Sequence, residues 1–226
     1  MASFAALRES YLWLEVLVKQ PPDFDLYLIT DRKQTQGRDL LWVVEQALDG
    51  GVKAVQLREK DLSGRDLCDL ADNLKRLCSA HGAKLFINDR VDVALAVDAD
   101  GVQLGSASMP VGAARELLGD QKFIGASTHS LAEASTAEQA GADFVLFGPV
   151  YFTPSKSAYG KPQGIEPLRE VVEKISIPVY AIGGIKPENI GAVKSSGARG
   201  AALISAVMAA EKPREAAREI LRRLKE

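Results

Sequence analysis

Short apolar runs, rich in β-branched and aromatic residues, recur along the chain from residue 26 onward and alternate with more polar segments. Runs of this length, bounded by glycine and polar residues, are typical of buried strands. They predict eight strands, at residues 26–30 (LYLIT), 53–58 (KAVQLR), 83–88 (AKLFIN), 100–104 (DGVQL), 122–127 (KFIGAS), 143–148 (DFVLFG), 177–183 (IPVYAIG) and 199–205 (RGAALIS).

The segments between these runs have the spacing of amphipathic helices. A helix over residues 62–80 would carry four leucines on one face, Leu67, Leu70, Leu74 and Leu77. Further helices are expected at residues 130–140, 187–196 and 212–224. Strands that alternate with helices without a break in composition predict an α/β fold, a single (β/α)8 TIM barrel over residues 25–226. A doubly wound open sheet is the alternative, but eight units in about 200 residues favour closure.

The first 24 residues lie outside this alternation. Their apolar positions recur at helical spacing, at Phe4, Leu7, Tyr11, Leu14, Leu17 and Val18. Charged residues interrupt the run, so it is neither a secretory signal nor a membrane span, and two prolines at 21–22 end it. We therefore predict an amphipathic helical extension, residues 1–24, which packs against the barrel or forms a subunit contact in a homo-oligomer.

Composition and charge narrow the class of partner. Of the 226 residues, 46% are apolar and 26% charged, and the formal net charge is −2, as is ordinary for a soluble protein. This charge gives no reason to expect nucleic acid or an anionic membrane as a partner. Cys68 and Cys78 have no metal or redox spacing, so we expect both to be reduced, in the cytoplasm.

Polar residues follow several of the predicted strands. In a (β/α)8 barrel the active site lies where strands end and the following loops begin. The candidates there are Gln56, Arg58, Lys60, Asn88, Asp89, Gln103, Ser106, Ser127, Thr128 and His129. The sixth strand runs into a long polar loop, residues 148–164. These segments are more polar than plain turns, and they predict a substrate site at this end of the barrel.

The last two strands predict a phosphate site. Gly183 and Gly184, in the motif AIGGI, let the main chain approach an anion without a Cβ in the way. Ile204 and Ser205 end the eighth strand, where a following helical turn would direct its N–H groups inward. A tight strand-to-helix turn without a ligand is the alternative for the two glycines.

A second anion site is predicted from cations on different loops. Arg58, Lys60 and Lys156 would converge on the barrel mouth around the single carboxylate of Asp89, and Asn88 could donate a hydrogen bond. Three cations around one carboxylate suit a diphosphate with a divalent metal better than a monophosphate. The alternative is a surface ion pair of Arg58 with its neighbouring carboxylates.

Five motifs carry a family resemblance. In chain order they are VQLREK, INDR, GPVYFTPSK, AIGGI and ALIS. This set resembles the thiamin phosphate synthase family and its paralogues, the TenI-type thiazole tautomerases, over residues 26–224. The resemblance implies a synthase that joins hydroxymethylpyrimidine diphosphate to thiazole phosphate and releases diphosphate. It also implies that the C–O bond to the diphosphate ionises first, with Mg²⁺ as cofactor.

The resemblance also assigns residues to each substrate. Those implied for the pyrimidine diphosphate are Gln56, Leu57, Arg58, Glu59, Lys60, Asn88, Ser127 and Lys156. Those implied for the thiazole phosphate are Thr153, Pro154, Ser155, Gly184, Ile204 and Ser205. Asp89 would bind magnesium, and the residues expected to act in catalysis are Arg58, Lys60, Lys156 and His129.

One position departs from the synthase pattern. Ser108, in GVQLGSAS, stands where synthases have a second aspartate for magnesium. Magnesium is often held by one or two carboxylates with substrate phosphates, so the loss weakens a site without removing it. The synthase is therefore favoured. The alternatives are a tautomerase that uses His129 to move a proton, and a barrel that binds thiamin precursors without turnover.

Overall fold

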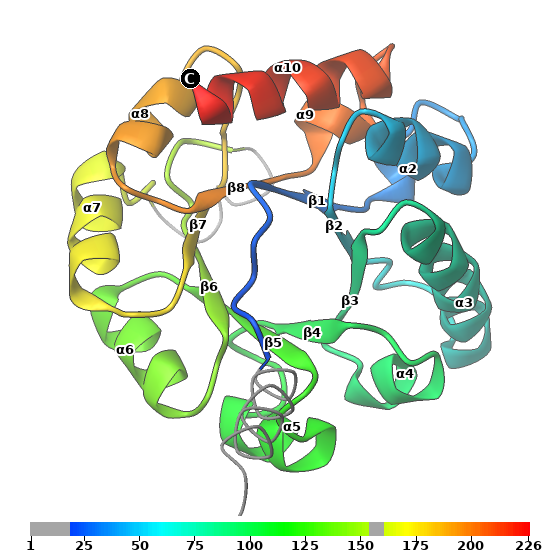
Figure 1. Cartoon of the computed structure of the whole chain (residues 1–226), viewed down its shortest axis with the longest axis horizontal. Helices are drawn as coiled ribbons and strands as arrows, with labels where there is room; N and C mark the ends of the chain where they lie inside the picture. The colour runs from blue at the N-terminus through cyan, green and yellow to red at the C-terminus, as the bar shows by residue number, and fades with distance from the viewer. Residues whose placement is uncertain (1–18, 154–160) are drawn as a thin grey trace, which may run out of the picture.

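Eight parallel strands close into a barrel in the computed structural model, which describes residues 19–153 and 161–226. Each strand pairs with the next along the chain, and the first pairs with the last (Figure 1). The strands are β1 (Leu26–Ile29), β2 (Ala54–Leu57), β3 (Lys84–Asn88), β4 (Gly101–Leu104), β5 (Phe123–Thr128), β6 (Phe144–Phe147), β7 (Val179–Ile182) and β8 (Gly200–Leu203). The predicted (β/α)8 barrel is confirmed.

Helices surround the barrel and connect successive strands (Figure 1). They are η1 (Arg32–Gln34), α2 (Leu40–Asp49), α3 (Gly64–Ala80), α4 (Val91–Ala96), α5 (Val111–Leu118), α6 (Leu131–Gln139), α7 (Ile165–Lys174), α8 (Ile190–Ser195), α9 (Ser205–Met208) and α10 (Pro213–Lys225). None of the helices in the described ranges is long and apolar enough to cross a membrane. The helices predicted at residues 62–80, 130–140, 187–196 and 212–224 correspond to α3, α6, α8 and α10.

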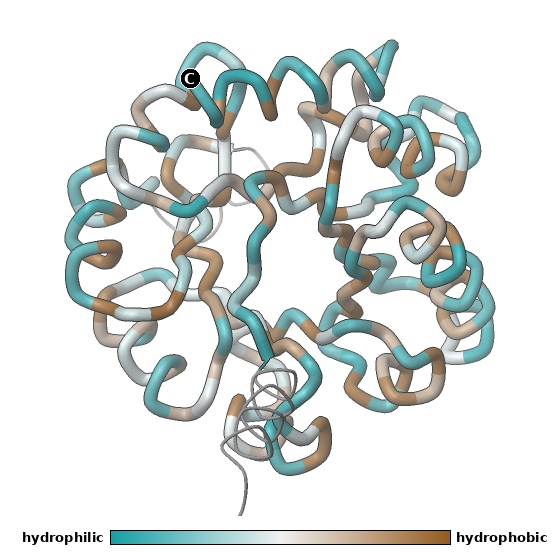
Figure 2. The backbone as a smooth tube through the Cα atoms, in the orientation of Figure 1, coloured by the Kyte–Doolittle hydropathy of each residue, from teal (hydrophilic) through white to brown (hydrophobic). Residues whose placement is uncertain are grey.

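Alternate residues of each strand point into the barrel or toward the helices. The outward residues form one core with the helices, and the inward residues form a second core of aromatic and small side chains. Figure 2 shows hydrophobic residues along the strands and on the helix surfaces that face them.

Both cysteines are free thiols, and burial raises the pKa of the Cys78 thiol to about 12, which keeps it protonated and unreactive.

An aromatic cluster fills the end of the barrel at which the strands begin. Phe24 stacks on Tyr180 with ring centroids 4.7 Å apart, and it meets Phe86 and Phe144 edge to face at 5.9 and 5.8 Å. Phe24 precedes β1, and its segment crosses the barrel in Figure 1. This end of the barrel is therefore sealed by apolar side chains, and the polar strand ends lie at the other end.

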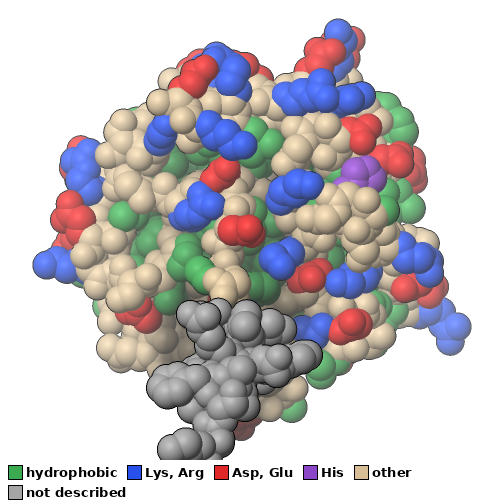
Figure 3. Space-filling model, in the orientation of Figure 1, with side chains coloured by type: hydrophobic (Ala, Val, Ile, Leu, Met, Phe, Trp, Pro, Cys, Tyr) green, Lys and Arg blue, Asp and Glu red, His purple; other side chains and the backbone are tan. Residues whose placement is uncertain are grey.

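The segment before β1 is fixed by charge as well as by packing. Lys19 donates a hydrogen bond to the Lys122 carbonyl oxygen (3.0 Å) and forms an ion pair with Asp143 (2.6 Å). The helical extension was predicted for residues 1–24; residues 19–24 are not helical, and residues 1–18 lie outside the described residues. Figure 3 shows basic and acidic side chains intermixed over this face, as the small net charge would suggest.

Candidate active site

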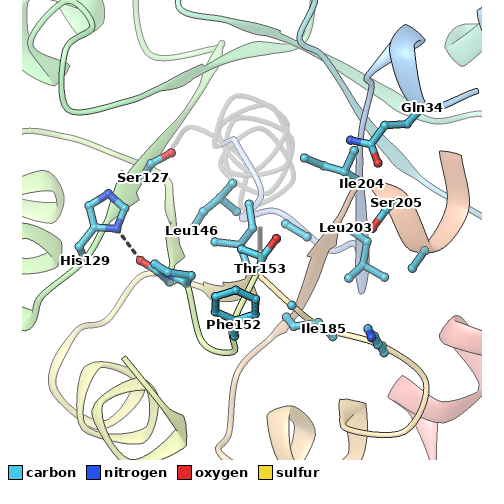
Figure 4. Close-up of a pocket in the computed structure, with 18 residues that line it drawn as sticks. Gln34, Ser127, His129, Leu146, Phe152, Thr153, Ile185, Leu203, Ile204 and Ser205 are labelled. Carbon is cyan, nitrogen blue, oxygen red and sulfur yellow. Dashed lines mark hydrogen bonds between the residues drawn. The ribbon is translucent and has the colours of Figure 1, made fainter. Parts of the chain in front are cut away.

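A cavity of about 590 Å³ opens among the loops that follow β5, β6, β7 and β8. It contains five of the predicted substrate-binding residues, Ser127, Thr153, Gly184, Ile204 and Ser205, together with His129. In Figure 4, Ser127 and His129 lie on one side of the cavity and Ile204 and Ser205 on the other. Segments that are distant in the sequence therefore meet at one site, as the barrel rule predicts.

The cavity also includes residues that sequence reasoning missed, among them Gln34, Leu146, Phe152, Ile185 and Lys186. Leu146, Phe152 and Ile185 are apolar, and an apolar residue in a strand or in the loop after it carries no chemical signal. Lys186 directly follows the AIGGI motif, so its charge could have been noticed there. Gln34 comes from the loop after β1, which the sequence did not mark as part of the site.

The turn at Gly184 is closely packed. Gly184 has a φ of 64°, and a Cβ built there would lie 2.5 Å from the Phe152 carbonyl oxygen and 2.8 Å from Tyr151 Cβ. The Asn189 side chain closes the same turn, because it accepts from the Lys186 N–H (2.8 Å) and donates to the Gly184 carbonyl (3.0 Å). The absence of a side chain at Gly184 therefore allows the loops after β6 and β7 to pack together.

Ile204 and Ser205 face this turn across the cavity. Ile204 precedes α9, which begins at Ser205, so the helical turn expected after the last strand is present. Backbone N–H groups at such a loop-to-helix junction are suitable donors for a phosphate. The predicted thiazole phosphate residues Gly184, Ile204 and Ser205 therefore line one cavity, whereas Pro154 and Ser155 lie outside the described residues.

The His129 ring is held by a carbonyl group. Its Nδ1 hydrogen-bonds to the Gly148 carbonyl oxygen, at the beginning of the long loop after β6 (Figure 4). A carbonyl only accepts, so Nδ1 is the donor in this contact. The backbone N–H of His129 donates to Glu133 (2.8 Å). The residue is placed to bridge β5 and the long loop.

The predicted diphosphate cations lie at the end of β2. Arg58 is half-buried and Lys60 is exposed, and within the described part of the chain neither side chain pairs with a carboxylate. The alternative pairing of Arg58 with Glu59 or Asp61 is not what the structure has, because those carboxylates pair with Arg32 and Lys33. Lys156 lies outside the described residues.

Three more residues that were predicted to bind the pyrimidine diphosphate, Gln56, Leu57 and Glu59, are buried. Leu57 packs in the outer core, so its side chain faces the helices and away from the mouth. The side-chain carboxylate of Glu59 is directed toward Arg32. Gln56 faces the barrel interior, where its side chain lies beside the buried Tyr27 hydroxyl, and it does not line the cavity.

Asp89 follows β3 and lies beside Ser108. It adopts a φ of 61°, in the left-handed region that few non-glycine residues occupy. Its carboxylate accepts from the Asn88 amide (2.7 Å) and from the Ser108 hydroxyl, which in turn accepts from the Gly105 N–H (2.6 Å). The position at which synthases carry a second aspartate is therefore adjacent to Asp89 here too.

These donors fit a magnesium ion only with help from a substrate. In the described ranges no three His, Cys, Asp or Glu side chains form a group that could hold a metal. One carboxylate, one hydroxyl and one amide are oxygen-bearing groups of the kind that magnesium accepts, and substrate phosphates and water commonly complete its octahedron. Asp89 therefore fits the metal as a single protein carboxylate.

Comparisons with known proteins agree with this arrangement. The family model described as thiamine monophosphate synthase matches residues 26–207. A putative thiamine-phosphate synthase of Geobacter sulfurreducens is 58% identical over 199 residues, covering 88% of this chain and 93% of the relative. The thiamine-phosphate synthase of Chlorobium luteolum is 50% identical over 196 residues, covering 87% of this chain and 91% of the relative.

Solved structures show the same likeness. Thiamine phosphate pyrophosphorylase from Pyrococcus furiosus superposes with a TM-score of 0.82 at 43% identity, covering 89% of this chain and 95% of that one. A 3-hexulose-6-phosphate synthase superposes with a TM-score of 0.66 at 20% identity, which shows the fold alone. On the match of the family model and of these full-length relatives, the chain belongs to the thiamine monophosphate synthase family.

Proposed function

We propose that the protein is a thiamin phosphate synthase, which couples hydroxymethylpyrimidine diphosphate to thiazole phosphate with Mg²⁺. The observation that carries the proposal is that Arg58 and Lys60, two cations without a carboxylate partner in residues 19–153 and 161–226, follow β2, the strand that pairs with β3, which Asp89 follows. A tautomerase, which acts on one thiazole carboxylate phosphate, has no diphosphate to bind. The relatives that share the full barrel carry the same name.

The reaction breaks one bond and forms one. The bond between the pyrimidine methylene carbon and the diphosphate oxygen breaks, and its electron pair leaves on the diphosphate. The thiazole nitrogen then donates its lone pair to the methylene carbon, which gives thiamin phosphate. Negative charge grows on the leaving diphosphate, so fixed cations in a preorganised site stabilise the transition state most.

The residues of this chain divide the work between the two substrates. Arg58 and Lys60 would bind and neutralise the diphosphate, and the cradle at Gly184 and Ser205 would hold the thiazole phosphate. Ser127 lines the cavity, and its hydroxyl accepts from the Gln103 amide (3.1 Å). Magnesium held by Asp89 would supply Lewis-acid stabilisation of the leaving oxygens.

The proposed ligands are the two small-molecule substrates, and the proposed location is the cytoplasm. The deciding experiment mixes the purified protein with both substrates and magnesium and measures thiamin phosphate and released diphosphate. A parallel assay supplies only the thiazole carboxylate phosphate. Coupling in the first assay supports the synthase. Isomerisation in the second without coupling in the first would make the protein a tautomerase, and binding of both substrates without product would leave the non-catalytic barrel.

Gly184→Ala is expected to raise the KM for thiazole phosphate by about tenfold, or ~1.4 kcal/mol. The added methyl group meets the carbonyl oxygen of Phe152 at 2.5 Å, so the loop after β6, which lines the cavity, must shift. Steady-state kinetics with each substrate varied in turn would measure the effect. Gly191→Ala is the control, because a Cβ at Gly191 meets nothing within 4 Å. An unchanged KM for Gly184→Ala would remove this turn from the phosphate site.

His129→Asn is expected to lower the coupling rate by less than about tenfold, because coupling requires no proton transfer from a side chain. The loss would come from a weaker link to the Gly148 carbonyl, which the asparagine amide can partly replace. The measurement is kcat for coupling beside any isomerase activity. Complete loss of coupling would instead make His129 a catalytic residue, as the sequence-based assignment has it.

A further inference from the structure

We propose that the loop between β1 and α2, residues 30–39, positions both halves of the substrate site, with Arg32 and Arg38 as its two positioning residues. This inference rests on the proposed function, since it names what keeps the two phosphate sites in place. The loop was not marked by any sequence motif, and only Gln34 from it lines the cavity. The contacts of Arg32 at one end of the loop concern the diphosphate site, and those of Arg38 at the other end concern the thiazole phosphate site.

At one end, Arg32 binds the buried carboxylate of Glu59. The Arg32 backbone N–H lies 3.0 and 3.2 Å from the two carboxylate oxygens, and its guanidinium Nη1 lies 3.0 Å from Oε2. The Glu59 side chain is only 3% exposed. Asp61 also accepts from Arg32 (2.7 Å), and the Lys33 ammonium group, followed by the Arg32 guanidinium, lowers the Asp61 pKa.

This contact has a direct consequence for charge at the diphosphate site. Glu59 lies between Arg58 and Lys60 in the sequence, and a carboxylate left free there would neutralise them and repel a diphosphate. Arg32 instead holds the Glu59 charge on the side of the β1 loop. The two cations remain without a carboxylate partner within the described part of the chain, and so available to an anion.

At the other end, Arg38 binds the end of α9. Its guanidinium donates to the carbonyl oxygens of Met208 (3.0 Å), Ala210 (2.7 Å) and Glu211 (3.1 Å). Gln36 donates to the carbonyl of Ala209 (2.9 Å). Because α9 is only four residues long and begins at Ser205, fixing its end also fixes the Ile204–Ser205 side of the phosphate cradle.

The two ends are joined inside the loop by Thr35. Its hydroxyl lies 3.0 Å from the Arg32 carbonyl oxygen and 2.7 Å from that of Arg38, and its residue is 2% exposed. Arg38 Nε donates back to the Thr35 carbonyl (2.7 Å). The loop is thus a compact unit that connects the β2 end with α9. Thr30 adds to it, because its hydroxyl accepts from the Arg58 backbone N–H (2.9 Å).

The test compares Arg32→Gln with Arg38→Gln, and Lys33→Gln is the control because Lys33 is exposed and forms only a surface pair. KM is measured for each substrate, and the Kd of inorganic diphosphate and of thiazole phosphate is measured by calorimetry. Arg32→Gln should raise the KM and Kd on the diphosphate side by about tenfold and leave the thiazole side within about twofold. Arg38→Gln should do the reverse, and Lys33→Gln should change neither.

A second substitution separates positioning from a general loss of structure. Adding Glu59→Gln to Arg32→Gln removes the unpaired buried carboxylate, so it should restore most of the diphosphate affinity. Should Arg38→Gln prove insoluble, Arg38→Lys replaces it, because a lysine cannot reach three carbonyl groups in the same planar geometry.

Equal effects of both variants on both substrates, or no rescue by Glu59→Gln, would overturn the inference. Normal kinetics in every variant would overturn it as well. The calorimetry remains readable if the wild-type protein fails to couple the substrates, so a failure of the proposed function is distinguishable from a failure of this inference.

Discussion

Asp89→Asn is expected to reduce coupling by at least about 10²-fold at a fixed magnesium concentration, because it removes a full charge from a preorganised electrostatic site. Asp89 is the carboxylate beside Ser108, and asparagine keeps its shape while losing its charge. With one protein carboxylate, the metal must depend on the substrate diphosphate for much of its binding. The measurement is the coupling rate against magnesium concentration, with a chelator as the zero point.

The companion variant, Ser108→Asp, should move the same curve in the opposite direction. Ser108 hydrogen-bonds to Asp89, so an aspartate there would place a second carboxylate next to the first. Half-maximal coupling should then require less magnesium, and direct titration of the substrate-free protein should show tighter metal binding. Asn73→Asp, on α3, is the control for an added negative charge. A coupling rate indifferent to both Asp89 and magnesium would contradict the synthase assignment.

Lys60→Ala is expected to lower kcat for coupling by about 10²-fold, since removing a group that stabilises developing charge typically has an effect of that order. Lys60 is exposed at the mouth end of β2 and has no carboxylate partner in the described ranges. Lys53→Ala is the matched control, because Lys53 precedes the same strand and donates to the His81 carbonyl (2.7 Å) at the far end of the barrel.

The two lysines separate charge at the site from charge on the protein as a whole. Lys53→Ala should leave kcat within about twofold, as expected for a surface substitution. If both variants lose activity equally, the effect is one of general electrostatics or stability. If neither does, the diphosphate is not bound at the end of β2.

The fold was predictable because the signals that determine it are local. Each apolar run became a strand within one or two residues of its predicted ends. The strand-end rule anticipated that Ser127, His129 and Ser205 would lie at one end of the barrel, and all three line the cavity there. The cradle at Gly184 and Ser205 followed from motifs in the last two strands. The proximity of Ser108 and Asp89 was implied by the family pattern, and the hydrogen bond between them agrees with it.

The features that were not predictable depend on contacts between distant segments. The sequence left an ion pair of Arg58 with Glu59 or Asp61 as the alternative to a diphosphate site, but it gave no sign that Arg32, on another loop, is the partner of both carboxylates. Phe24 was assigned to the N-terminal extension, yet its ring packs inside the barrel against aromatic residues from four strands. Neither choice of partner leaves a periodic signal in the sequence.

The position of Phe24 also bears on the order in which the molecule can fold. Phe24 is translated early, but its stacking partner Tyr180 lies on β7, near the end of the chain. The pairing of β1 is likewise complete only when β8 is present. A nascent chain therefore holds an incomplete inner core, with aromatic side chains exposed, until almost all of it has left the ribosome. Contacts of such long sequence separation slow folding and prolong that exposure. In this barrel, the segment around Phe24 and β1 can therefore reach its final packing only after β7 and β8 have been synthesised.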